Sequence, residues 1–116
     1  MKKTIRGELK KKLHAGEVVV GPFVIVPSVA MIDTLGYAGM DFCILDTEHG
    51  SLSMETVADL VIAAQGTGVA PIVRVGGNEE WPILRALDIG ADGVQVPQIN
   101  QQSDAEKVVH AAKYAP

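Results

Sequence analysis

Short apolar runs alternate with amphipathic stretches along most of the chain. The apolar runs are rich in β-branched residues and predict strands, and each is followed by a polar loop and a stretch of helical periodicity. The predicted strands are residues 18–26, 42–45, 70–75 and 93–97. The predicted helices are residues 4–13, 29–38, 53–65, 79–89 and 103–113. The order is therefore one helix followed by four strand–helix units.

Local signals mark several boundaries. Gly21-Pro22 is positioned to divide the first strand, and Ser53 is expected to cap the helix that follows it. Ser103 and Glu106 have the spacing of a capping box. The residues expected to point inward from the helix after Ser53 are Met54, Val57, Val61 and Ile62. The first helix is expected to be amphipathic, with one face formed by Ile5, Leu9 and Leu13.

Strands that are apolar on both faces and alternate with helices favour an α/β fold with a parallel sheet covered by helices. Two architectures fit this pattern. One is a small open flavodoxin-like sheet. The other is the first half of a TIM (β/α)8 barrel, a domain of about 250 residues in its usual form. The sequence shows no linker, so residues 1–116 are expected to belong to one domain.

Composition excludes several classes of protein. The 116 residues are 47% hydrophobic, which suits a globular core and argues against disorder. No apolar run reaches the roughly 20 residues of a membrane span, and no apolar segment follows the basic N-terminus as in a signal peptide. Cys43 is the single cysteine, so an internal disulfide is impossible and a reducing, cytoplasmic location is expected.

Charge is unevenly distributed. Six of the ten cations lie in the first twelve residues, whereas residues 13–116 carry four cations against thirteen acids, a net of −9. Such a surface repels nucleic acid, and the basic N-terminal stretch fits a solvated helix face. We therefore expect no nucleic-acid or membrane partner.

Each predicted strand is followed by polar residues at its carboxyl end. They are Ser28 after the first strand, Asp46 to His49 after the second, Arg74 after the third, and Gln98 with Asn100 after the fourth. In both candidate architectures, ligands bind at that edge of the sheet. The sequence thus predicts a site where these ends meet.

The residues after the second and third strands indicate a chemistry. Arg74 is the only cation between Lys12 and Arg85, and its planar fork suits a carboxylate or an enolate beside one. An internal ion pair with Asp46 or Glu48 is the simpler alternative. His49 follows two carboxylates and is a candidate general base. Two carboxylates are also able to bind a divalent cation, although they are few for a complete cage.

Other chemistries lack a candidate residue. None of the lysines ends a strand, so a Schiff-base mechanism has no lysine in the site. No G-x-G-x-x-G motif follows the first strand, which leaves a dinucleotide site unsupported. Cys43 lies within an apolar strand and is interpreted as a core residue.

Several segments together resemble the HpcH/HpaI aldolases. They are Leu45-Asp-Thr-Glu-His-Gly50, Val73-Arg74 and Gly90-Ala-Asp-Gly-Val-Gln-Val-Pro97, with Gly39-Met-Asp-Phe and Lys113-Tyr-Ala-Pro116 in support. The resemblance runs from about residue 20 to the last residue. It implies a (β/α)8 barrel that is usually oligomeric, with this chain covering about the first four β/α units. It also implies a class II lyase that cleaves 4-hydroxy-2-oxo acids to pyruvate, or a close relative, and an aldehyde.

The resemblance assigns roles to the residues at the site. His49 would be the acid/base residue, and Arg74 would bind the pyruvyl oxygens and stabilise the enolate. Gln98 would help to bind substrate. A divalent metal (Mg²⁺, Mn²⁺ or Co²⁺) would chelate the pyruvyl group, and its direct ligands are expected on strands later than those present here.

Three acidic residues complete the implied site. Asp46 and Glu48 would lie near the metal-bound waters and His49. Asp88 matches an acid thought to partner the histidine. Because it falls late on its helix, it is expected to act, if at all, in the site of a neighbouring subunit.

Alternatives remain open at the level of sequence. The chain is expected to be the N-terminal half of a barrel that is a fragment, is complemented by a second half, or pairs with its own copy. A non-catalytic half-barrel or flavodoxin-like binding or assembly module is a second hypothesis. An acyl-CoA lyase resembling the citrate lyase β-subunit is a third.

Overall fold

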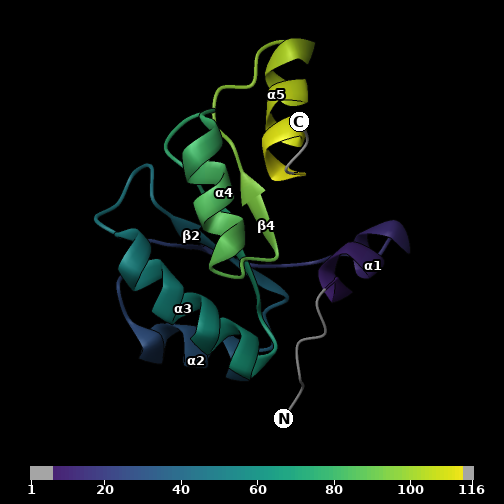
Figure 1. Ribbon diagram of the computed structural model, residues 1–116. Coiled ribbons are helices and arrows are strands. Elements are labelled where there is room, and N and C mark those ends of the chain that lie inside the picture. Colours follow the sequence, from purple (N-terminus) through teal and green to yellow (C-terminus); the bar gives the residue numbers. More distant parts are fainter. Residues whose placement is uncertain (1–6, 114–116) are drawn as a thin grey trace.

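The computed structural model describes residues 7–113 and forms a parallel sheet flanked by helices (Figure 1). The elements in order are α1 (Glu8–His14), β1 (Phe23–Val24), α2 (Val29–Tyr37), β2 (Phe42–Asp46), α3 (Met54–Thr67), β3 (Ala70–Arg74), α4 (Glu80–Asp88), β4 (Gly93–Gln95) and α5 (Gln102–Ala112). The start of the predicted first helix, including Ile5, and residues 114–116 lie outside the described part. Of the helices in residues 7–113, none combines the length and apolarity needed to cross a membrane.

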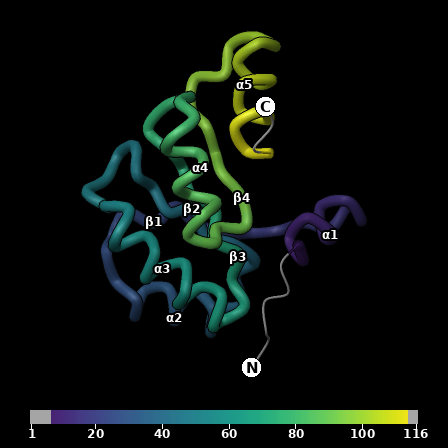
Figure 2. Tube along the Cα trace, in the orientation of Figure 1, coloured from purple at the N-terminus to yellow at the C-terminus, as the bar shows by residue number. Residues whose placement is uncertain are grey.

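The four strands are parallel and lie in the order β1-β2-β3-β4 (Figure 2). Phe23 is in register with Ile44, Ile44 with Ile72, and Ile72 with Gly93. In a flavodoxin-like sheet the second strand would lie outside the first, because the chain reverses its direction of winding. The sequential order observed here excludes that alternative and is the order of strands around a (β/α)8 barrel.

The hydrophobic core lies between the sheet and its helices. Alternate residues of the central strands, Cys43 and Leu45 on β2 and Val73 on β3, are completely buried. Burial raises the pKa of the Cys43 thiol to about 12, because the charged thiolate is disfavoured there. The interpretation of Cys43 as a core residue is confirmed.

The first strand is shorter than predicted. Of residues 18–26, only Phe23 and Val24 form a continuous ladder, although Val20 accepts a backbone hydrogen bond from Asp41, just before β2, and Pro22 accepts one from Ile44 within β2. A Cβ atom on Gly21 would lie 2.1 Å from the carbonyl oxygen of Phe42. Glycine therefore permits the close backbone approach here, and the adjacent proline has no N–H to continue the ladder.

Helix α3 begins as predicted, and Ser53 accepts a hydrogen bond of 3.2 Å from the amide of Thr56. The expectation that Ile62 points inward is wrong, because 68% of this residue is exposed. The buried stripe instead consists of Val57, Leu60, Val61 and Ala64. These positions recur every three to four residues, and Ile62 falls outside that stripe.

Helix α5 begins earlier than predicted. The carboxylate of Asp104 accepts hydrogen bonds from the amides of Asn100 and Gln101, which caps a helix that starts at Gln102. The predicted box of Ser103 and Glu106 is therefore wrong by two residues. Asp104, rather than Glu106, is the acidic residue whose carboxylate accepts hydrogen bonds from the backbone amides at the start of this helix.

Helix α1 lies at the opposite end of the strands from their carboxyl ends. Lys12 Nζ donates to Asp41 Oδ1 at 2.7 Å, and Asp41, which directly precedes β2, also accepts from the amide of Val20. No residue of α1 is buried among the described residues, and Leu13 is 54% exposed. Of the expected apolar face, Leu9 is thus half-buried and Leu13 exposed, and Ile5 lies outside the described residues.

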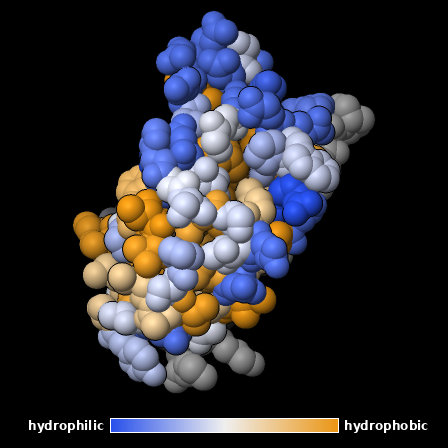
Figure 3. Space-filling view, turned by 90° about the vertical axis from the view of Figure 1, so that its left-hand side faces the viewer, coloured by the Kyte–Doolittle hydropathy of each residue, from blue (hydrophilic) through white to orange (hydrophobic). Residues whose placement is uncertain are grey.

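Apolar surface also remains near the carboxyl ends of the strands. Ile25, Val26 and Val29 follow β1 and are 45–53% exposed. Figure 3 shows apolar residues gathered over the part of the molecule below the hydrophilic surface of α5. Much of the apolar surface beside β1 is therefore left uncovered by the described residues.

Replacement of Gly36 by alanine is expected to destabilise the fold. A Cβ atom there would lie 2.4 Å from Thr67 Cβ, where α2 packs against α3. Overpacking of this kind costs about 1–3 kcal/mol, against a gain of at most about 1 kcal/mol from helix propensity. Urea unfolding of the variant measures the difference.

Gly66→Ala on α3 is the control, because nothing lies within 4 Å of its Cβ, and it is expected to be neutral or stabilising. Equal effects of the two substitutions would contradict the close packing.

Candidate active site

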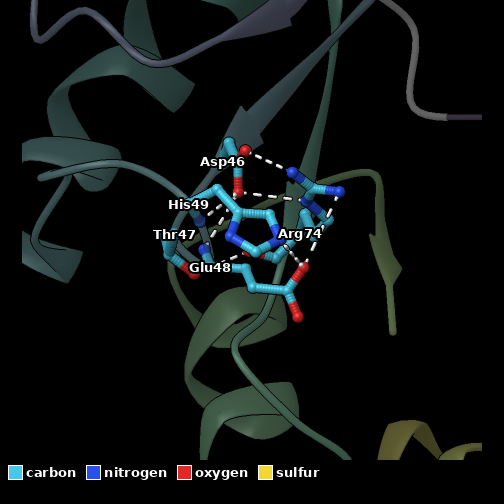
Figure 4. A network of polar contacts seen from close by, with 5 residues as sticks. All are labelled: Asp46, Thr47, Glu48, His49 and Arg74. Carbon is cyan, nitrogen blue, oxygen red and sulfur yellow. Dashed lines mark hydrogen bonds and ion pairs between the residues drawn. The ribbon is translucent and has the colours of Figure 1, made fainter. Parts of the chain in front are cut away.

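The polar residues that follow β2 and β3 meet at one edge of the sheet (Figure 4). Asp46 and Arg74 are the last residues of their strands and are directly in register. Thr47 continues this alignment, because its amide and hydroxyl both donate to the carbonyl oxygen of Arg74, at 3.0 and 2.6 Å. The edge is the one at which ligands bind in (β/α)8 barrels.

Asp46 and Arg74 form a two-point ion pair. Arg74 Nε donates to Asp46 Oδ1 at 3.0 Å, and Arg74 Nη2 donates to Asp46 Oδ2. Asp46 is 2% exposed, and its Oδ1 also accepts from the amides of Glu48 and His49, at 2.9 and 3.1 Å. The prediction that Arg74 meets the acids after the second strand is confirmed, and so is the internal ion pair.

The ion pair keeps Asp46 ionised. The hydrogen bonds from Arg74 lower the pKa of this carboxyl to about 2, and the two loop amides act in the same direction against the effect of burial. The charge of Asp46 is therefore available to orient Arg74 throughout the physiological range.

The stability of the fold is expected to depend on Asp46 at acid pH. Because the pKa is lowered from 3.8 to about 2 in the folded chain, the contribution is complete above pH 3.8 and is lost as the pH falls through about 2. Two pKa units correspond to about 2–3 kcal/mol. Unfolding free energies of the wild type and Asp46→Asn, measured between pH 5 and 2, should converge by about this amount. Parallel pH profiles would contradict the assignment.

Glu48 lies between His49 and Arg74. His49 Nε2 lies 2.9 Å from Glu48 Oε1, and the same oxygen lies 3.7 Å from Arg74 Nη1. The Glu48 side chain is 15% exposed, whereas the His49 side chain is 71% exposed. Glu48 therefore anchors one ring nitrogen of a solvent-accessible imidazole, which leaves Nδ1 free to exchange protons when Nε2 carries the hydrogen.

The guanidinium of Arg74 has donors to spare. Asp46 uses one N–H on Nε and one on Nη2, out of five in total. The ring of Phe23 lies under the guanidinium, with its centroid 4.7 Å from Cζ. The remaining N–H groups on Nη1 and Nη2 form a second fork, with Glu48 Oε1 3.7 Å from Nη1, and a fork of this kind suits an anion with two oxygens.

Sequence analysis missed Phe23 and Thr47. Phe23 was hidden within a long apolar run, and its proximity to Arg74 depends on the register of β1 against β2. The alternation of side chains along the strands would have revealed its proximity to Arg74, because Phe23, Ile44 and Ile72 are in register and point to the same side of the sheet.

The residues present do not form a metal cage. Residues 7–113 contain no group of three or more His, Cys, Asp or Glu side chains placed to hold a metal ion. Asp46 is committed to Arg74 and to two amides, so the hypothesis that Asp46 and Glu48 together bind a cation does not fit the geometry.

Two predicted site residues are not among the polar contacts that join Asp46, Glu48, His49 and Arg74. Asp88 is the exposed last residue of α4, and the nine residues of this helix span about 13 Å from the site edge to its far end. Gln98 follows β4 and is exposed, with a φ of 58° that is unusual for a residue with a side chain. The structure thus brings together Asp46, Glu48, His49 and Arg74, without these two.

Comparison with known proteins identifies relatives of most of the chain. A family model described as HpcH/HpaI aldolase/citrate lyase matches residues 20–116. A hydroxypyruvate/pyruvate aldolase from Roseobacter denitrificans is 33% identical over 107 residues, which are 92% of this chain and 42% of that protein. A 2-dehydro-3,6-dideoxy-6-sulfogluconate aldolase from Pseudomonas putida is 36% identical, over 84% of this chain and 38% of its own length. The chain spans about two fifths of the length of these relatives.

Solved structures agree with this result. The HpcH/HpaI aldolase from Desulfitobacterium hafniense matches with a TM-score of 0.87 and 35% identity, over 93% of this chain and 42% of that one. The citrate synthase SbnG also matches with a TM-score of 0.87, at 37% identity, over 93% of this chain and 44% of its own. Both cover the four β/α units, which places the fold in the TIM-barrel class.

Proposed function

Because the chain belongs to the HpcH/HpaI aldolase/citrate lyase family, we propose that it supplies the oxo-acid-binding and proton-transfer residues of an aldolase. The proposed reaction cleaves a 4-hydroxy-2-oxo acid to pyruvate, or a close relative, and an aldehyde. The chain would act as the first four β/α units of a single barrel domain. The remaining units of such a barrel would complete the site.

The second fork of Arg74 is the observation that carries this proposal. Asp46 fixes one edge of the guanidinium, and the Nη1 and Nη2 hydrogens, with Glu48 3.7 Å from Nη1, are not hydrogen-bonded to Asp46 and would meet two oxygens of the oxo acid. When the C3–C4 bond breaks, its electrons move onto C3 and the keto oxygen, and an enolate forms. A fixed positive charge beside that oxygen stabilises the developing negative charge. Enolate stabilisation is the electrostatic task of an aldolase that lacks a Schiff-base lysine.

His49 is proposed as the general base. It takes the proton of the C4 hydroxyl, directly or through a water, as C4 becomes the aldehyde carbonyl. The protonated imidazole is stabilised by Glu48, which lies 2.9 Å from Nε2. The same proton then returns to C3 of the enolate and releases pyruvate.

A divalent metal remains part of the proposal, since it would polarise the keto oxygen together with Arg74. Its ligands would come from residues outside this chain's cluster. Asp88 would act only across a subunit boundary, because α4 places it away from the cluster in its own chain. Gln98 is proposed to contact substrate from the end of β4.

Substitution of His49 tests the proposed chemistry. With a 4-hydroxy-2-oxo acid and Mg²⁺ or Mn²⁺, pyruvate release is expected to fall by about 10²-fold or more in His49→Ala. Coupled reduction of pyruvate by lactate dehydrogenase measures the rate. His110→Ala removes an exposed histidine from α5 and should leave the rate unchanged. Release that survives His49→Ala would overturn the proposal.

The similarity to SbnG favours a second candidate, condensation or cleavage of a citrate-like acid. Arg74 would then bind the oxo acid that accepts or releases the acetyl carbon. The discriminating observation is the substrate. Citrate formation from oxaloacetate and acetyl-CoA, without pyruvate release from 4-hydroxy-2-oxo acids, would favour this alternative.

A further inference from the structure

Phe23 lies against the one residue on which the proposed chemistry depends most. We infer that Phe23 is a positioning residue, whose ring holds the guanidinium of Arg74 in the plane that presents its second fork to the substrate. The inference rests on the proposed function of Arg74. Phe23 acts through Arg74 and is not itself assigned a chemical step.

The sheet brings the two residues together. Phe23 is paired with Ile44, two residues before Asp46 on β2, and Asp46 is paired with Arg74. The aromatic ring therefore starts from β1 and the guanidinium from β3, and they meet across β2. The centroid of the ring lies 4.7 Å from Arg74 Cζ, within the range of a cation–π interaction.

Phe23 and Asp46 constrain different movements of the guanidinium. The two hydrogen bonds to Asp46 fix one edge, but a planar group held at one edge is still able to tilt about it. A ring stacked against one face opposes that tilt. The electron-rich face of the ring also attracts the positive charge, and it occupies none of the N–H groups of the guanidinium. With Asp46 on one edge and Phe23 on one face, an incoming anion would approach the fork on Nη1 and Nη2, beside Glu48, which lies 3.7 Å from Nη1.

The exposure of Phe23 is consistent with this role. The residue is 52% exposed, although it belongs to a strand beside the buried core. Its neighbour Val24, which points to the opposite side, is 4% exposed and supplies the core contact. Phe23 thus contributes little to the core of the described residues, and its most specific contact is with Arg74.

Phe23→Leu and Phe23→Tyr separate the aromatic face from simple apolar bulk. Leucine keeps an apolar side chain without a π-system, and tyrosine restores the ring. The control is Phe42→Leu, which changes the chain's other phenylalanine at the far end of β2. Amide spectra and urea unfolding establish that each variant is folded before it is compared.

The first readout needs no ligand. The Nε–Hε resonance of Arg74, identified by its loss in Arg74→Lys, is expected to carry an upfield ring-current shift in the wild type. That shift should disappear in Phe23→Leu and persist in Phe23→Tyr and Phe42→Leu. An unchanged resonance in Phe23→Leu would overturn the contact.

The second readout is binding of oxalate, a planar dianion that resembles the enolate of an oxo acid, in a buffer containing Mg²⁺. Phe23→Leu is expected to weaken binding by about three- to ten-fold, and Phe23→Tyr should stay within about two-fold of the wild type. Binding that requires Arg74 but is indifferent to Phe23 would overturn this inference and leave the proposed function standing. Oxalate binding that is absent, or independent of Arg74, would overturn both.

Discussion

Replacement of Arg74 by lysine is expected to lower the rate of pyruvate release by about 10²–10³-fold, the usual cost of removing one fixed donor to an oxyanion. Lysine keeps the charge but not the planar fork. Its ammonium group cannot hold Asp46 at two points and still offer two parallel N–H groups to the substrate. The measurement is kcat/KM for pyruvate release from a 4-hydroxy-2-oxo acid, compared with the wild type.

Arg85→Lys provides the matched control for this prediction. Arg85 is an exposed arginine on α4, and its guanidinium also lies over an aromatic ring, that of Trp81, at 5.4 Å. The control therefore removes the same chemical group from a similar stacked contact outside the site, and kcat/KM should remain within about two-fold, as surface changes usually do. If Arg74→Lys also left kcat/KM within about two-fold of the wild type, a positive charge alone would be sufficient for the reaction and the proposed role of the fork would be wrong.

Replacement of Asp46 by alanine is expected to cost about 3 kcal/mol of unfolding free energy, in the range seen when one partner of a buried ion pair is removed. The substitution leaves the guanidinium of Arg74 without its carboxylate. It also leaves the backbone amides of Glu48 and His49, which both donate to Asp46 Oδ1, without this acceptor. Chemical denaturation at pH 7 measures the loss. Glu48→Ala is the control, and it should cost less than about 1 kcal/mol, because Glu48 meets Arg74 only at 3.7 Å.

A double-mutant cycle separates the ion pair from the loop. The combined variant, Asp46→Ala with Arg74→Ala, should be about 1–3 kcal/mol more stable than the sum of the single effects predicts, because neither charge is then left unpaired. Additive effects would mean that the pair contributes little, and that the loss in Asp46→Ala comes from the two amides. The cycle thus tests the geometry of the site independently of catalysis.

Much of the candidate site was predictable from sequence, because it depends on short-range patterns. The apolar runs at residues 42–45 and 70–75 ended in polar residues, and parallel strands bring their carboxyl ends to one edge. This was sufficient to predict that Arg74 would meet Asp46 and Glu48. The cap at Ser53 was likewise a local signal, since a serine hydroxyl competes well for the free amides of the first turn.

The sequence by itself thus determined the succession of elements, the edge that carries the polar residues and the residue types available for catalysis. The tertiary structure decided which partners those residues take, because strand order and register depend on contacts between residues far apart in the chain. Sequential pairing excluded the flavodoxin-like sheet, directed the Asp46 carboxylate to Arg74 and brought Phe23 from β1 beneath the same guanidinium. It also left Ile62 outside the buried stripe of α3, since packing decides which face of the helix is covered. The periodicity within one strand or helix does not say which strands are neighbours, so these contacts could be known only from the folded structure.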